Sequence, residues 1–170
     1  MPIIETKFDF DHRQLLIDFN SVEIPKDSTY DQNQIAITSF DGKNVMVDNK
    51  FNEDYKRIPE IDLNYMNEWF KGKYTEEVIN DLNKTYETTK WRFMRLTPER
   101  RAYSYHRDET KRLHIPLLTS EDCFFIIDEQ LYKMNQEGKV YEMDTTKKHT
   151  ALNLGWNDRI HMVGVFYDEV

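Results

Sequence analysis

The spacing of hydrophobic and polar residues changes near the middle of the chain. After residue 90, apolar residues recur at every second position in short segments, and turn-forming residues separate these segments. This is the pattern of half-buried β-strands. It predicts strands near residues 91–97, 101–106, 111–118, 123–128, 131–134, 139–144, 149–154 and 159–167.

Before residue 90, three segments have the periodicity of amphipathic helices. The first follows Asp11, a residue type that caps helix N-termini. The second begins at Asp62 and stops near Gly72, and the third spans residues 75–88. Each places its apolar residues three or four positions apart, so that they share one face. These faces consist of Leu15, Leu16 and Phe19, of Leu63, Met66 and Phe70, and of Val78, Ile79, Leu82 and Tyr86.

Residues 34–40 alternate between apolar and polar, and the turn at 41–43 leads into residues 44–47, which predicts a hairpin. We therefore interpret residues 1–170 as a single domain. In it, the helices and hairpin of residues 1–90 buttress a core formed by residues 91–167. Eight short strands with turns between them predict a double-stranded β-helix, the jelly roll of cupin-like proteins. The expected fold class is mainly β with flanking helices.

Composition narrows the function classes. A chain of 170 residues with 39% hydrophobic and 14% aromatic residues can bury a sizeable core. Its net charge of −8 disfavours binding to nucleic acid through phosphate neutralisation. No apolar run is long enough to span a membrane, and no signal sequence opens the chain, so we expect a cytoplasmic location. The single cysteine, Cys123, excludes an intrachain disulfide.

Three residues of the second part have the character of metal ligands. His106 and Asp108 form a His-x-Asp pair, and His149 follows at a distance. Two imidazoles and one carboxylate are the facial triad that binds Fe(II) and leaves positions open for substrates. Structural zinc would instead want thiolates or a closed shell of four ligands.

The predicted strand 159–167 carries a second candidate group. Arg159 and His161 share a face with Val163 and Val165. An arginine on an inward face beside valines must find an anion, and a dicarboxylate co-substrate would provide one. His161 is either a hydrogen-bonding residue of the pocket or a structural residue. Arg92 and Arg95 are either solvated or able to meet a substrate carboxylate at the pocket mouth.

Five ordered segments resemble a known family. They are Trp91-Arg92-Phe93-Met94-Arg95-Leu96-Thr97-Pro98, Tyr105-His106-Arg107-Asp108, Arg112-Leu113-His114-Ile115-Pro116-Leu117-Leu118-Thr119, Asp144-Thr145-Thr146-Lys147-Lys148-His149-Thr150-Ala151-Leu152-Asn153 and Arg159-Ile160-His161-Met162-Val163. Together they resemble the aspartyl/asparaginyl β-hydroxylase-like 2-oxoglutarate oxygenases, over roughly residues 70–167.

The resemblance implies a role for each of five residues. His106, Asp108 and His149 would bind Fe(II), and Arg159 would bind the distal carboxylate of 2-oxoglutarate. His114 would sit beside the co-substrate and donate a hydrogen bond to its metal-bound carboxylate. Some relatives bind iron through two histidines and no carboxylate, and by that alignment His114 would be the ligand in place of Asp108.

The resemblance therefore predicts an Fe(II)- and 2-oxoglutarate-dependent dioxygenase, an enzyme that hydroxylates an unactivated C–H bond and releases succinate and CO2. Its substrate would be a small molecule, such as a free amino acid, or an amino-acid side chain in a peptide. Two rivals remain open. One is a non-catalytic, cupin-like metal-binding module, and the other is a zinc or manganese metalloenzyme on the same scaffold.

Overall fold

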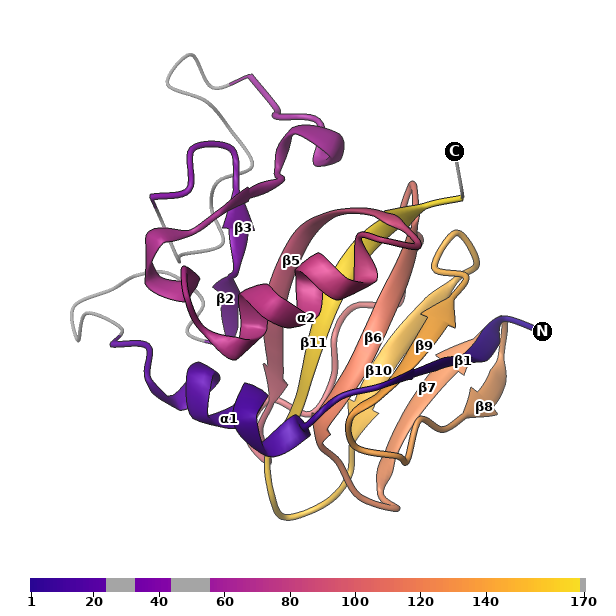
Figure 1. Cartoon of the computed structure of the whole chain (residues 1–170). Coiled ribbons are helices and arrows are strands. Elements are labelled where there is room, and N and C mark those ends of the chain that lie inside the picture. The colour runs from indigo at the N-terminus through magenta and orange to yellow at the C-terminus, as the bar shows by residue number, and fades with distance from the viewer. Residues whose placement is uncertain (24–32, 44–55, 169–170) are drawn as a thin grey trace.

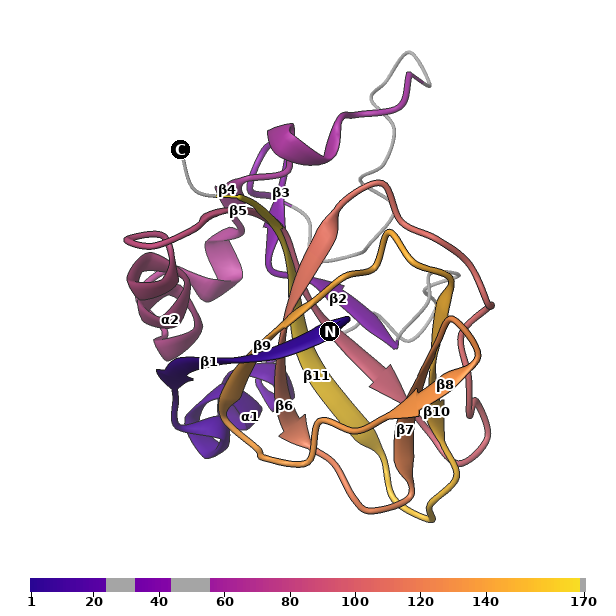
Figure 2. The same ribbon diagram turned by 90° about the vertical axis from the view of Figure 1, so that its right-hand side faces the viewer.

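The computed structural model describes residues 1–23, 33–43 and 56–168. Two antiparallel sheets contribute side chains to a common interior, and helices cover the outer face of the larger sheet (Figures 1 and 2). The larger sheet has the strand order β1 (Ile3–Asp9), β9 (Lys139–Met143), β6 (Lys111–Leu118), β11 (Arg159–Tyr167), β5 (Glu87–Leu96) and β2 (Gln34–Ala36). The smaller sheet has the order β10 (His149–Asn153), β7 (Cys123–Ile127) and β8 (Gln130–Tyr132). This is the predicted jelly roll.

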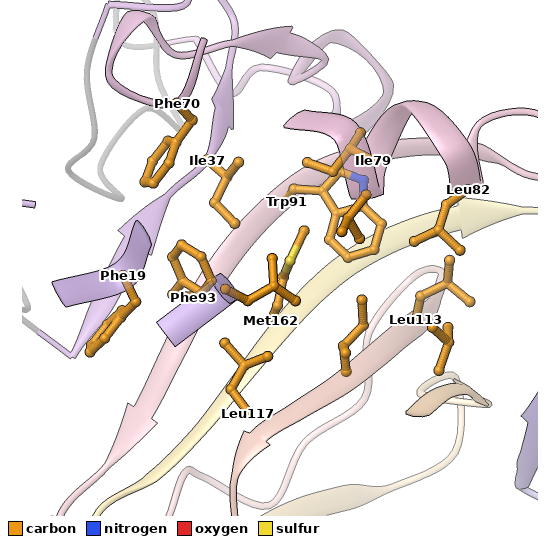
Figure 3. Close-up of a cluster of buried hydrophobic side chains, with 14 of the residues drawn as sticks. Phe19, Ile37, Phe70, Ile79, Leu82, Trp91, Phe93, Leu113, Leu117 and Met162 are labelled. Atoms are coloured by element: carbon orange, nitrogen blue, oxygen red, sulfur yellow. The ribbon is translucent and has the colours of Figure 1, made fainter. Parts of the chain in front are cut away.

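The outer face of the larger sheet is the main hydrophobic core. Helices α1 (His12–Asn20) and α2 (Tyr74–Leu82) pack there, and Figure 3 shows Ile79 and Leu82 near Trp91, Leu113 and Met162. Strand alternation sends every second residue of β5, β6 and β11 to this face and the residues between them to the interior. The helices thus cover the outer face of the sheet, and the inner face is available to carry the functional side chains.

The inner face is only partly apolar. A smaller cluster joins the two sheets there, made of Leu96, Phe125, Ile127, Met134, Tyr141, Met143 and Ala151. Polar and charged side chains occupy the rest of the interior, as the alternation in 159–167 predicted. On the outer face, by contrast, Gly164 of β11 lies so close to Trp91 that a Cβ atom there would be 2.4 Å from the indole ring. Close packing on the outer face therefore supports the alternation of outward-facing and inward-facing residues along β11.

Helix α1 confirms its prediction, because the Asp11 carboxylate accepts from the backbone N–H groups of Arg13 and Gln14. The predicted helix 75–88 is shorter than expected. It ends at Leu82, and the chain then enters β5 at Glu87, where pairing with β11 takes over the backbone hydrogen bonds. Tyr86 still packs against the same core.

The predicted helix from Asp62 to Gly72 is wrong. The segment contains two short 3-10 helices, η1 (Glu60–Asp62) and η2 (Glu68–Phe70), and the short strand β4 (Tyr65–Met66) between them. Tertiary hydrogen bonds explain the difference: the Asn67 backbone N–H donates to Ile37, and the Asn67 amide donates to the Ala36 carbonyl. The backbone is thus tied to a neighbouring segment and does not form a helix with itself.

The predicted hairpin at 34–47 also differs. β2 pairs with β5, and β3 (Thr38–Ser39) pairs with β4, while residues 44–47 lie outside the described residues. The predicted strand at 101–106 is wrong too, since only isolated bridges occur there. Strand β1 was not predicted at all, because its charged and exposed positions obscure the alternation. Within the described ranges, no helix has the length and apolar character needed to cross a membrane.

Candidate metal centre

Backbone pairing brings His106 and His149 together. His106 precedes β6 in an irregular segment and forms an antiparallel bridge with His149, the first residue of β10. The His106 N–H donates to the His149 carbonyl at 3.0 Å, and the His149 N–H donates back at 2.8 Å. The Asp108 N–H donates to the Thr145 carbonyl at 2.9 Å. Residues far apart in sequence are therefore held side by side by main-chain bonds.

The ligand atoms of these three residues all lie within 4.8 Å of one another. The His106 Nε2 lies 3.5 Å from Asp108 Oδ1, and the His149 Nε2 lies 3.8 Å from Asp108 Oδ2. In the described part of the chain, no other group of three or more His, Cys, Asp or Glu side chains has this proximity. The arrangement presents two imidazole nitrogens and a carboxylate to one point.

The other ring nitrogen of each histidine faces a backbone carbonyl. His106 Nδ1 is 2.7 Å from the Ser104 oxygen, and His149 Nδ1 is 2.9 Å from the Lys147 oxygen. A carbonyl only accepts, so each Nδ1 carries a proton, and in the neutral ring Nε2 then keeps its lone pair, as metal-bound histidines require. Burial lowers the pKa of His149, against the smaller raising effects of the Lys147 carbonyl and Asp108. That imidazole is therefore neutral at pH 7 and fits a metal.

Asp108 is oriented by a buried ion-pair network. Arg112 Nε lies 3.2 Å from Asp108 Oδ2, and the other nitrogens of Arg112 each lie 3.1 Å from an oxygen of Glu60 on η1. Lys90 of β5 also pairs with Glu60. Burial raises the pKa of Glu60, but Arg112 and Lys90 outweigh this effect and hold it well below its ordinary value. Burial, followed by the charge of Arg92, lowers the pKa of Lys90 to about 8.

Arg159, at the start of β11, is only 2% exposed. Its guanidinium carbon lies 4.8 Å from the centre of the Phe125 ring, and one of its terminal nitrogens lies 3.2 Å from His161 Nδ1. Within the described ranges, no carboxylate forms an ion pair with it. Burial lowers its pKa to about 10, so it remains charged at neutral pH. The buried cation predicted from the sequence is therefore present, and none of the described carboxylates neutralises its charge.

His114 and His161 continue this chain of contacts, with their Nδ1 atoms 3.3 Å apart. The Arg159 guanidinium only donates, so His161 Nδ1 must accept. His114 Nδ1 therefore carries a proton, and its Nε2 can only accept. Burial, and next the charge of Arg159, hold the pKa of both rings far below the ordinary value. Donation from His114 to a co-substrate carboxylate would require the opposite tautomer.

A cavity of about 920 Å³ connects these groups. Its lining includes the three grouped ligand candidates together with His114 and Arg159. Arg92 also lines the cavity. Arg95 does not, and its guanidinium lies beside Asp158 and the Phe19 ring.

The roles of Glu60, Lys90 and Arg112 were not predicted from the sequence. Arg112 lies on the inward face of an alternating strand, and an arginine in such a position needs an anion, so the sequence did contain a signal for this residue. Nothing in the sequence pointed to Glu60 as that anion.

Comparison with known protein families identifies the family of the chain. The family described as aspartyl/asparaginyl beta-hydroxylase matches residues 71–168. No curated protein matches the chain significantly.

Two solved structures are similar to the chain. The viral collagen prolyl hydroxylase of Paramecium Bursaria Chlorella virus-1, in complex with 2OG, is similar with a TM-score of 0.55 at 10% identity, over 99% of this chain and 97% of that one. A protein described as IDO from Bacillus thuringiensis is similar with a TM-score of 0.48 at 10% identity, over 94% of this chain and 82% of that one. At such identities the likeness concerns the fold, and the first of the two supports the jelly roll.

Proposed function

The chain belongs to the aspartyl/asparaginyl beta-hydroxylase family, and we propose that it uses Fe(II) and 2-oxoglutarate to hydroxylate an unactivated C–H bond of an amino acid or a peptide side chain. The predicted enzyme class, that of the 2-oxoglutarate-dependent hydroxylases, is confirmed at the level of the family. The iron, the co-substrate and the site residues are our proposal for this chain. One observation carries it: His106, Asp108 and His149 offer their ligand atoms within 4.8 Å of one another.

The donor set fits a facial-triad metal. Two imidazoles that present Nε2 to one point, and one carboxylate, suit Fe(II) better than they suit structural zinc. Bound by these three residues, Fe(II) would supply dioxygen activation coupled to the oxidation of 2-oxoglutarate to succinate and CO2. The chain's own contribution is geometric. The carbonyls of Ser104 and Lys147 fix the two rings, and Arg112 fixes the carboxylate.

Arg159 would bind the distal carboxylate of 2-oxoglutarate. A guanidinium in a buried place binds a carboxylate through two charge-assisted hydrogen bonds and so fixes its orientation. His161 holds the guanidinium from one side and Phe125 from another, so little side-chain freedom is lost on binding. The walls of the cavity would exclude water from the co-substrate.

A titration of 2-oxoglutarate into the anaerobic Fe(II) protein tests this proposal. We expect a weak charge-transfer band in the visible range, and succinate release once dioxygen and a substrate are added. Without 2-oxoglutarate binding, the oxygenase proposal fails. Metal binding alone would then favour the non-catalytic module or the zinc or manganese enzyme.

Variants at Arg159 sharpen the test. Arg159→Gln should weaken 2-oxoglutarate binding roughly ten- to a hundred-fold, because a hydrogen bond to a charged group contributes about 1.5–3 kcal/mol. Arg159→Lys should recover only part of this loss, since a point charge lacks the planar fork. Fe(II) affinity without co-substrate should stay unchanged in both. Arg95→Gln, on the neighbouring strand but outside the cavity lining, is the matched control.

A further inference from the structure

Arg159, His161 and His114 form a buried chain of contacts beside the ring of Phe125. The centre of that ring lies 5.3 Å from the ring centre of His114 and 5.9 Å from that of His161. Arg159 and His114 line the cavity, whereas His161 is only 1% exposed and is not among the described residues that line it. His161 is the middle member of the chain, and its contacts determine what the other two present to the cavity.

Two hydrogen-bond donors share one lone pair of His161. Arg159 approaches its Nδ1 atom at 3.2 Å, and His114 Nδ1 approaches the same atom at 3.3 Å. Burial, the largest cause, lowers the pKa of both rings, so each imidazole carries one proton. Because Nδ1 of His161 accepts, its proton lies on Nε2. Both contacts are longer than the usual distance of about 2.9–3.0 Å, as expected for two donors at one acceptor.

The Nε2 atom of His161 has no acceptor. It is buried and makes no hydrogen bond among the described residues. Met94 of β5 and Pro116 of β6 lie opposite His161 on the two neighbouring strands, and neither side chain has an oxygen or nitrogen that accepts a hydrogen bond. A buried N–H without an acceptor is destabilising. This tautomer of His161 is therefore unfavourable in itself, and the need of Arg159 for an acceptor maintains it.

The opposite tautomers become favourable when a carboxylate binds Arg159. The guanidinium then donates to the carboxylate oxygens and no longer needs Nδ1 of His161. His161 can carry its proton on Nδ1 and donate to Nδ1 of His114. The proton of His114 then lies on Nε2. Each ring stays neutral, the number of protons does not change, and His161 no longer has a buried N–H without an acceptor.

We infer that His161 is a positioning residue that couples the two ends of the 2-oxoglutarate site: a carboxylate on Arg159 reverses both imidazole tautomers and makes His114 a donor to the metal-bound carboxylate. The inference rests on the proposed function and adds a selection step to it. A 2-oxo acid without a distal carboxylate leaves Arg159 bonded to His161. His114 then remains an acceptor and cannot donate to the carboxylate of that acid, so the site favours 2-oxoglutarate.

Nitrogen-15 NMR of the histidine side chains measures the tautomers. The protein is loaded with Zn(II), which is diamagnetic and does not turn over, and is studied alone, with 2-oxoglutarate and with 2-oxobutanoate, which lacks the distal carboxylate. Spectra of His114→Asn and His161→Asn assign the signals. Alone and with 2-oxobutanoate, we expect protons on His161 Nε2 and His114 Nδ1. With 2-oxoglutarate, we expect them on His161 Nδ1 and His114 Nε2. Any other pattern with bound ligand overturns the inference.

The ratio of the two affinities is the second measurement, made by calorimetry on the same Zn(II) protein. In His161→Phe the coupling is lost, so the preference for 2-oxoglutarate over 2-oxobutanoate should fall roughly ten-fold, the contribution of one hydrogen bond to a charged group. His161→Asn should restore most of this preference, because an amide rotates to accept or to donate. His12→Asn, which removes a contact with Glu137 outside the cavity, is the control and should leave the ratio within about two-fold.

Equal losses of both affinities in His161→Phe would show that His161 only supports the structure, and would contradict the inference. Failure of the proposed function has a different signature, in which wild type binds neither 2-oxo acid. Glutarate, which has two carboxylates and no 2-oxo group, is then titrated into the protein without metal. Reversal of both tautomers by glutarate would support the coupling of Arg159 to His114, and unchanged tautomers would overturn it.

Discussion

At the scale of single residues, the site depends on the contact that each histidine makes through the ring nitrogen that does not face the metal position. His106 and His149 resemble surface histidines when considered one at a time. The Ser104 and Lys147 carbonyls fix a proton on each Nδ1 and thereby leave each Nε2 of the neutral rings free to bind a metal beside the Asp108 carboxylate. The sequence spacing predicted which three residues would gather. It could not predict the tautomers, because the carbonyls that set them depend on the local backbone path.

The choice between Asp108 and His114 as a ligand is testable by metal binding. Asp108→Ala should lower affinity for Co(II), a stable substitute for Fe(II), by at least about a hundred-fold, since loss of an outer-shell partner alone costs ten- to a hundred-fold. His114→Ala should leave this affinity nearly unchanged, because His114 lies outside the group of three. Isothermal titration calorimetry measures both. The reverse result, with His114 essential and Asp108 dispensable, would support the arrangement with two histidine ligands.

Arg92 shows which features of a single residue could be predicted from the sequence and which could not. The sequence placed Arg92 and Arg95 on one strand and gave both the same two possible roles. The structure separates them, because β5 directs Arg92 into the cavity and Arg95 toward Asp158. Strand parity could have indicated this difference. The hydrogen bond from Arg92 to the Gln34 amide oxygen could not have been foreseen, since β2 was expected to pair within a hairpin and instead pairs with β5.

At the scale of elements, Glu60 connects η1 to β5 and β6 through Lys90 and Arg112. Glu60→Gln should lower the free energy of unfolding at pH 7 by about 3–5 kcal/mol, because it removes the anion that Lys90 pairs with and leaves the buried Arg112 with Asp108 alone. Urea denaturation measures this change. Glu109→Gln, which removes an exposed pair with Arg57, is the matched control and should cost about 1 kcal/mol or less. Equal effects of the two substitutions would show that the buried network is not structural.

The same network predicts a dependence of stability on pH. The pKa of Glu60 is lower in the folded protein than its ordinary value of 4.5. Its stabilising contribution is therefore complete above pH 4.5 and is lost as the pH falls below that value. Wild type should lose stability between pH 5 and pH 3 more steeply than Glu60→Gln does. Denaturant midpoints across this range, in both proteins, provide the check, and parallel curves would contradict the assignment.

Helix α2 supports the larger sheet from its outer face. Leu82 is fully buried against this core, so Leu82→Ala should lower the free energy of unfolding by about 2–5 kcal/mol. Ile17 of α1 is 58% exposed, and Ile17→Ala should change stability by less than about 0.5 kcal/mol. Thermal melts of the two variants give the comparison. A small effect at Leu82 would mean that the helix is not part of the core.

At the scale of the whole molecule, the alternating strands predicted the jelly roll correctly, while the first seventy residues were harder to predict. The segment near Asp62 has helical spacing, yet its polar groups bond to β2 and β3. That outcome depends on contacts remote in sequence, which periodicity does not contain. Strand β1 pairs with β9 at an edge of the sheet, and its alternation is masked by charged positions that face solvent.

The distribution of the core predicts how the protein behaves without its metal. The larger hydrophobic cluster lies behind the sheet, and the proposed ligands sit at a bridge between an irregular segment and β10. Folding of the sheets and helices therefore does not require metal, unlike folding of a zinc finger. After treatment with a chelator, we expect unchanged far-ultraviolet circular dichroism and a cooperative melt. Metal added at a hundred times its dissociation constant should stabilise the protein by about 2.7 kcal/mol, which corresponds to a rise of roughly 5–10 °C in Tm.

Hydrogen exchange should locate this stabilisation. Protection should increase at residues 101–110 when metal binds, because this segment carries two of the ligands and is held only by isolated bridges and few backbone hydrogen bonds. The amides of β6 and β11 should exchange slowly with and without metal, since strands pair with each of them on both sides. A metal-free protein that exchanges throughout the sheet would show that the metal organises the fold. The His106, Asp108 and His149 site would then be structural as well as chemical.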